Sequence, residues 1–338
     1  QALFGALEEL GRVRESLAVS QGAIEMSREH GLPLTEIRAR NNLAAWLGSY
    51  EPRRSLEVLG PAFELAERLG HREWVAKLGF RAWVAFEAGD WDLAAAIVGD
   101  QLRDDLPLIS WLPLVATEAV LGAWRHDPRQ PTGGIDRLRE RTTAGATAQD
   151  WSAVHWTECH VALAAGQLQD ARRSAQALQA AGQAIGDIAN PSWMAGIVAS
   201  WQGDEAGVRE ALAVLEPVPA VFRSIPGMRA HLGGVRAAMA GRRGEAASHF
   251  VEAADAFRRA GSAWCLAMCL ADAATYLGAD DPIGRGSLEE VRVLATGWVA
   301  SVLLERIDWL IGRGRPRRDR ASVVRAEVAD PLLEPSER

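Results

Sequence analysis

One short stretch of the chain holds residue types that bind metal ions: His155, Glu158, Cys159 and His160. His155 and Cys159 are four residues apart, so they would share one face of a helix. A zinc site needs at least three protein ligands, and no second pair of ligands stands out elsewhere in the sequence. We therefore expect these side chains to pack in a helical interior, and we predict no metal site and no cofactor.

The cysteines could act as nucleophiles or redox pairs, but their spacing argues against both roles. Cys265 and Cys269 lie four positions apart in an apolar segment, whereas redox and zinc motifs use Cys-x-x-Cys. Buried free cysteines pack like small hydrophobic residues. The chain has three cysteines in all, too few for a disulfide framework, which favours a reducing cytoplasmic location.

Acid–base catalysis would need two carboxylates that converge in one pocket. The candidate acids fall in separate segments, and their spacing singles out no pair: Glu87, Glu118, Glu158 and Asp272. Lys77 is the only lysine, and it lacks the Gly-rich context of a phosphate-binding loop. We predict no catalytic residue, and an enzyme with an acid–base site in a concave helical face remains the alternative.

The thirteen tryptophans indicate binding rather than catalysis. A tryptophan side chain offers a wide contact surface, little conformational entropy to lose and one N–H donor. A face lined by tryptophans would therefore suit a peptide or a flat small molecule. Whether such a face exists depends on the elements that carry these residues.

Glycines recur where one apolar helical stretch ends and the next begins: Gly11, Gly48, Gly89, Gly166, Gly203, Gly241 and Gly278. The intervals are 37 to 41 residues, except for one of 77 that would hold a further hinge at 126–128. Glycine adopts the left-handed conformation that ends a helix without steric cost. A fixed period of this size indicates helical hairpins stacked as a solenoid.

The predicted fold is all-α, a right-handed α-solenoid of about eight helical hairpins over residues 1–312. The second helices carry apolar residues at helical spacing, as at Ala246, Phe250 and Ala253, and no segment has the alternating pattern of a strand. Residues 313–338 are rich in arginine and then acidic, and we predict a disordered tail there.

The repeats resemble the tetratricopeptide repeat (TPR). Ala246, Phe250 and Ala253 match the Ala-Phe-Ala spacing of that family's second helix, and Tyr50 and Trp91 each stand two residues after a hinge glycine. The period is longer than the family's repeat of about 34 residues, so we describe the array as TPR-like. The resemblance covers nearly the whole chain.

A narrower resemblance involves the segment 304–308 (Leu-Glu-Arg-Ile-Asp) and the Ala-, Arg- and Trp-rich composition. Both are similar to the C-terminal regions of bacterial STAND-type ATPase signalling proteins, namely class III adenylate or guanylate cyclases with an ATPase module and LuxR-type regulators. The resemblance implies a regulatory region with ATPase or cyclase domains elsewhere in the same polypeptide. The chain does not begin with Met, so we expect a piece of a longer protein.

The concave face lined by first helices is the usual binding surface of such an array. Transferring the family's groove positions gives twelve candidates: Arg38, Asn42, Trp46, Trp83, Phe86, Glu87, Trp124, Trp156, His160, Trp193, Trp201 and Tyr276. The expected ligand is a protein, a peptide or a small effector. The alternative is that the tryptophans are core, because an error of one residue in register turns a side chain inward.

The overall composition limits the partners. The formal net charge is −7, and no aromatic residue is interleaved with the arginines at 313–320, so nucleic acid is not an expected partner. No apolar run is long enough to cross a membrane. Three functions therefore stay open. Exposed inner tryptophans would favour a binding module, two close carboxylates an enzyme, and an inner face filled by its own side chains a structural scaffold or oligomerisation array.

Overall fold

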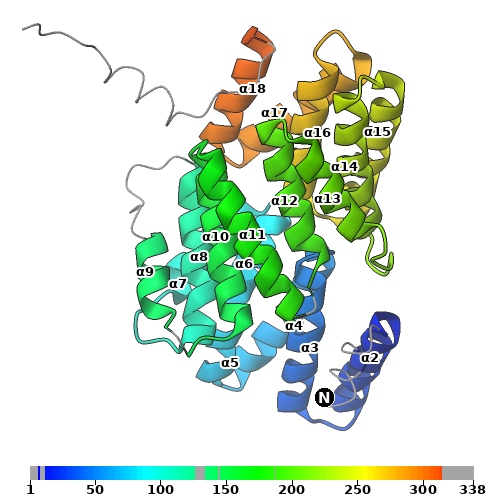
Figure 1. Cartoon of the computed structure of the whole chain (residues 1–338). Helices are drawn as coiled ribbons and strands as arrows, with labels where there is room; N and C mark the ends of the chain where they lie inside the picture. Colours follow the sequence, from blue (N-terminus) through cyan, green and yellow to red (C-terminus); the bar gives the residue numbers. More distant parts are fainter. Residues whose placement is uncertain (1–6, 8–11, 126–133, 144, 186, 314–338) are drawn as a thin grey trace, which may run out of the picture.

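The computed structural model describes residues 7, 12–125, 134–143, 145–185 and 187–313 (Figure 1). These residues form helices joined by short turns, with no strand among them, which confirms the all-α prediction for this part of the chain. The first half contains α2 (Val13–Glu29), α3 (Pro33–Gly48), α4 (Pro52–Arg68), α5 (Arg72–Lys77), the 3-10 helix η1 (Leu78–Phe80), α6 (Arg81–Glu87), α7 (Trp91–Gln101), α8 (Leu108–Arg125) and α9 (Gly134–Arg141).

The second half contains α10 (Ala148–Ala164), α11 (Leu168–Ile185), α12 (Ala189–Gln202), α13 (Glu205–Leu215), α14 (Ser224–Met239), α15 (Arg243–Ala260), α16 (Ala263–Leu277), α17 (Pro282–Gly297) and α18 (Ser301–Arg313). None of the described helices has the length and hydropathy that a bilayer span requires. The predicted tail beyond residue 313, the hinge at 126–128 and Gly11 lie outside the described residues.

Helices that follow one another pack in pairs, as in α3 with α4, α12 with α13 and α14 with α15. Five of the predicted hinge glycines have a positive φ, between 70° and 81°: Gly89, Gly166, Gly203, Gly241 and Gly278. Gly48 is instead the last residue of α3. Glycines with a positive φ also follow α2, α4 and α15, at Gly31, Gly70 and Gly261. Glycine therefore ends helices both at the predicted hinges and at these other turns.

The helical segment that begins at Arg72 is interrupted, because the chain tightens into a 3-10 turn at Leu78–Phe80 between α5 and α6. Gly79 lies in this turn, and a Cβ built on it would stand 3.4 Å from the Leu114 side chain of α8. The close approach of α8 is a tertiary feature that the sequence period does not contain.

The first helices of successive pairs also contact each other, as in α6 with α8, α8 with α10, α12 with α14 and α14 with α16. In α16 every residue from 264 to 274 is buried. A helix that is buried all round belongs to the interior rather than to one wall of an open groove. These helices therefore form the centre of the molecule.

Among the described residues, two sets of contacts join segments that are far apart in the sequence, and we call them closure contacts. The first closure contact consists of Tyr50, Glu51, Asp187, Phe222 and Arg223. The Tyr50 and Phe222 rings stack with centroids 4.6 Å apart, the Tyr50 hydroxyl donates to Asp187 Oδ1 at 2.5 Å, and Glu51 Oε1 accepts from the Arg223 backbone N–H at 3.1 Å. A linear array has contacts only between neighbouring repeats, so this contact is an additional fold-back.

The second closure contact consists of Trp91, Arg125, Trp298 and Ser301. The two indole rings stack at 4.9 Å, Arg125 Nε donates to the Trp298 carbonyl at 3.0 Å, and Ser301 Oγ donates to the Arg125 carbonyl at 2.7 Å. Between Trp298 and Ser301 the backbone passes through Val299 with φ of 57°, a strained conformation for a β-branched residue. The strained turn directs α18 against α8 and α16.

Candidate functional site

Four of the twelve predicted groove residues, Phe86, Trp124, Trp156 and His160, lie together in an aromatic cluster of the interior. We define the central aromatic cluster as seven side chains from α6, α7, α8, α10, α16 and the turn before α18: Phe86, Trp91, Trp124, Trp156, His160, Trp264 and Trp298. The His160 ring lies 4.2 Å from that of Trp156 and 5.2 Å from that of Trp264. All seven side chains are buried, so the cluster is a packed core.

Seven of the twelve predicted binding residues are buried: Phe86, Glu87, Trp124, Trp156, His160, Trp193 and Trp201. In the structure these seven side chains do not form an exposed face. The physical reason is the fold-back, because the inner faces of the first helices cover one another across the centre. These residues could reach a ligand only if the inner helices separated, and a binding role for them stays a prediction.

The other five predicted residues lie at the margins of the core. Arg38 is exposed and Asn42 is half-buried. Trp46 stacks with Phe222 at 6.5 Å and thus extends the first closure contact. The remaining two also contact core residues: Trp83 meets Trp156 edge-on at 6.3 Å, and the Tyr276 hydroxyl donates to the Ser200 carbonyl at 3.0 Å.

A buried polar network around Asp272 joins α12, α14 and α16. Trp193 Nε1 donates to His231 Nδ1 at 3.1 Å, so the other ring nitrogen, Nε2, carries a hydrogen and donates to Asp272 Oδ2, also at 3.1 Å. Trp201 Nε1 and Ser200 Oγ each donate to the same carboxylate at 3.0 Å. The carboxylate thus satisfies three buried donors.

The Asp272 network contains serine, histidine and aspartate, yet its geometry does not fit nucleophilic catalysis. The Ser200 hydroxyl donates to Asp272 rather than to a histidine. The lone pair of His231 Nδ1 is occupied by Trp193, so the ring has no free nitrogen to accept the serine proton. The network fixes three inner helices relative to one another.

Burial shifts the pKa of two ionisable groups, His160 of the aromatic cluster and the neighbouring Glu87, toward the neutral form. Burial lowers the pKa of His160 to about 3, and burial raises the pKa of Glu87 to about 8, although a hydrogen bond from Trp83 acts in the opposite direction. His160 Nδ1 accepts from Trp124 Nε1 at 3.4 Å, while His160 Nε2 has no partner among the described residues. Both groups lie in the buried interior.

The acids considered for catalysis interact with basic or hydrogen-bond-donating side chains rather than with a second carboxylate. Glu118 pairs with Arg137 at 3.7 Å, and Glu158 pairs with Arg139 at 2.7 Å and with His155 at 3.1 Å. Burial raises the pKa of the Cys159 thiol. Within the described parts of the chain, no three histidine, cysteine or acidic side chains gather as a metal site would require.

A second region was not predicted from the sequence. α2, α3 and α4 surround a cavity of about 420 Å³, which we call the charged cavity. α2 lies at the edge of the molecule and packs mainly against α3 (Figure 1). The lining residues are Gln21, Ile24, Glu25, Arg28, Arg40, Arg54, Glu57 and Val58. Three arginines from three helices therefore face one hollow.

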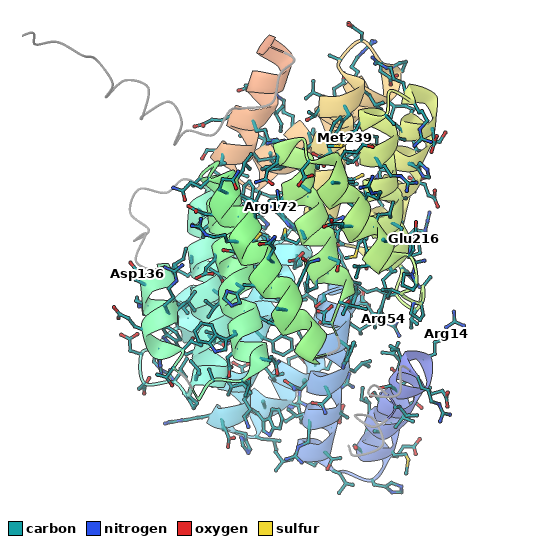
Figure 2. The ribbon with its side chains drawn as sticks, viewed as in Figure 1. Arg14, Arg54, Asp136, Arg172, Glu216 and Met239 are labelled. Atoms are coloured by element: carbon teal, nitrogen blue, oxygen red, sulfur yellow. The ribbon has the colours of Figure 1, made fainter. Side chains whose placement is uncertain are left out.

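The three arginines differ in how firmly they are held. Arg40 is only 14% exposed and pairs with Glu36 at 2.8 Å. Arg54, labelled in Figure 2, is about half exposed and lies 3.4 Å from Glu51. Arg28 is exposed and has no ion pair with any described residue. The sequence contains a basic residue in each helix but no periodic signal that would bring them together.

Comparison with known proteins assigns neither region. No protein-family model matches the chain, and no curated protein matches it significantly. The central aromatic cluster offers a filled interior, and the charged cavity offers an open space lined by ionisable groups.

Proposed function

We propose that the chain is a non-catalytic ligand- or protein-binding repeat module. In this proposal it is a right-handed TPR-like α-solenoid of about eight hairpins that folds back on itself. Support comes from the left-handed glycines at the predicted hinge spacing and from the pairwise packing of consecutive helices. Three buried free thiols are compatible with the reducing cytoplasm that we expect for it.

The observation that carries this proposal is the charged cavity. Its volume of about 420 Å³ lies in the range that accommodates small ligands. It lies at the end of the array, where α2 packs mainly against one helix, while the central face is filled by the protein's own side chains. We therefore assign binding to the α2–α4 end rather than to the concave face.

We further propose that the module is the sensor or regulatory region of a larger bacterial signalling protein, an ATPase-linked adenylate cyclase or a transcriptional regulator. The support is the resemblance of the segment 304–308, which lies in α18. Any ATPase or cyclase activity would belong to other domains of the same polypeptide. Ligand binding would act by favouring one of two arrangements of the helices.

A second candidate function is a structural scaffold. The filled inner face is the observation that favours it, because such a face leaves no groove for a peptide. A scaffold would need no ligand, and its stability would not respond to small molecules. The two candidates therefore differ in a measurable property.

The test is thermal melting of the purified chain against a panel of metabolites and short peptides, including uncharged members. A ligand at a hundred times its Kd should add about 2.7 kcal/mol to the free energy of unfolding, and the midpoint should rise by several degrees. The shift should disappear in Val58→Glu, which places a charge on the partly buried apolar part of the cavity lining. A panel without any shift would reject the binding module and leave the scaffold.

A further inference from the structure

The charged cavity combines three features that together specify a class of ligand. It has three guanidinium groups, two carboxylates and an apolar part formed by Ile24 and Val58. From these we infer that it binds a small molecule bearing an oxyanion, a carboxylate or a phosphate, beside a hydrogen-bond donor. Amino acids and sugar phosphates share this chemistry. The inference rests on the proposed function and names its ligand.

Arg40 supplies the fixed part of the site. Its Nε and Nη2 atoms both lie within 3 Å of Glu36 Oε1, at 2.9 and 2.8 Å. The interaction holds the guanidinium plane, and the side chain is largely buried. The third nitrogen, Nη1, has no partner among the described residues, and it belongs to the Arg40 side chain that lines the cavity. An arginine held in this way loses little entropy when it binds an oxyanion.

Arg54 is only weakly paired, with Glu51, and Arg28 has no ion pair with a described residue, so both can supply charge to a ligand. The Arg54–Glu51 distance of 3.4 Å is long for a charged hydrogen bond, and Arg28 has no ion pair with a described residue. An oxyanion would therefore gain two charged donors without breaking a strong interaction. Arginine is suited to this role because its planar fork matches carboxylate and phosphate geometry.

The two carboxylates determine which chemical group of the ligand can lie next to its oxyanion. Glu25 and Glu57 line the same cavity, and each would repel a bare anion. A ligand with an ammonium or hydroxyl group next to its oxyanion would instead donate a hydrogen bond to them. Gln21 already donates to Glu25 Oε1, at the long distance of 3.5 Å, so this carboxylate can accept a stronger donor.

The experiment is isothermal titration of the chain in a low-salt buffer without phosphate. The probes are L-glutamate, ribose 5-phosphate and inorganic phosphate, each up to about 10 mM, which detects binding as weak as about −4 kcal/mol. We expect L-glutamate or ribose 5-phosphate to bind more tightly than inorganic phosphate. Arg28→Gln should weaken that binding about tenfold, as expected for the loss of one charged hydrogen bond.

Arg14→Gln is the matched control, because Arg14 is an exposed arginine of α2 that does not line the cavity (Figure 2). Equal loss in both variants would show a general charge effect and overturn the inference. Absence of binding by all three probes, or binding of inorganic phosphate as tight as the organic probes, would also overturn it. An uncharged panel compound that shifts melting in the wild type but not in Val58→Glu would then leave the proposed function standing without this ligand class.

Discussion

The central aromatic cluster and the charged cavity use similar numbers of large side chains in opposite ways. In the cluster, rings from five helices and one turn pack in stacked, tilted and edge-on pairs, with centroid distances of 4.2 to 5.2 Å among the closest, and all of them are buried. In the cavity, long charged side chains from three helices surround about 420 Å³ of space. The first arrangement gains hydrophobic free energy and packing, and the second gains neither.

The difference between the cluster and the cavity shows that the closure contacts change which surfaces can bind a partner. The two closure contacts join segments more than 130 residues apart, and they bring the inner helices together. Surface that an open array would present to a partner becomes core. At the α2–α4 end the lining residues Glu25, Arg28, Arg54 and Glu57 are exposed, so these ionisable side chains remain in contact with water and keep their charge.

The largest expected effect follows from emptying the cluster. Trp264 is 1% exposed and lies against Phe86, Trp124 and His160. Trp264→Ala should lower the free energy of unfolding by about 3 to 5 kcal/mol, because it removes buried apolar surface and leaves a cavity. Urea denaturation followed by circular dichroism measures this loss.

Trp151→Ala is the matched control for that change. Trp151 is only half-buried and contacts His155 near the surface, so it should cost clearly less. If the two variants were equally stable, the central tryptophans would not form the main core and the comparison would fail.

The next effect depends on pH. Glu87 titrates near 4.5 in an unfolded chain and at about 8 in the folded one, so unfolding between these values releases a proton. The free energy of unfolding should therefore fall as pH rises, by up to about 1.4 kcal/mol per pH unit. Glu87→Gln should remove this dependence, and its advantage over the wild type should grow from pH 5 to pH 8.

Comparing the free energies of unfolding of the wild type and Glu87→Gln at each pH cancels the contributions of other buried groups such as His160. Denaturant titrations at pH 5, 6.5 and 8 provide the measurement. An advantage of Glu87→Gln that is constant with pH would mean that the carboxyl stays exposed to water and that the cluster margin is open.

The sequence predicted the helices and several of the turns between them, but it did not predict the two closure contacts. Glycine period and Ala-Phe-Ala spacing predicted hinge positions, and Ala246, Phe250 and Ala253 are buried on α15 as a packing face requires. These are local features, since each depends on residues within one hairpin. The sequence pattern also predicted that several tryptophans lie on one side of the array, but it did not indicate whether that side is exposed to solvent.

Closure depends on pairs that share no sequence spacing. Tyr50 stacks on Phe222, which lies in a Pro-rich connection, and Arg125 reaches the carbonyl of Trp298. Whether such residues meet depends on the summed rotation of all repeats between them. The charged cavity was missed for the same reason, because Arg28, Arg40 and Arg54 come together only through the packing of three helices.

A smaller effect is expected from the second closure contact. Arg125→Ala removes the donor to the Trp298 carbonyl, at 3.0 Å, and a pair with exposed Asp92, at 2.7 Å. The loss should be about 1 to 2 kcal/mol, mostly from the unsatisfied carbonyl, and amide hydrogen exchange in α18 should become faster. Arg285→Ala is the control, because Arg285 also donates to a backbone carbonyl, that of Ala279, but within one local turn. Equal exchange in the two variants would mean that Arg125 does not hold α18.

The smallest effect on stability is expected in the charged cavity. Arg28→Ala should change the free energy of unfolding by less than about 0.5 kcal/mol, because the side chain is exposed and has no ion pair with a described residue. Urea midpoints of this variant and of Arg14→Ala should coincide. A loss above about 1 kcal/mol would show that Arg28 holds α2 against its neighbours, and the cavity would then be part of the framework. A negligible loss, together with weaker titration of the organic probes, would mean that the cavity side chains serve binding while the buried rings serve stability.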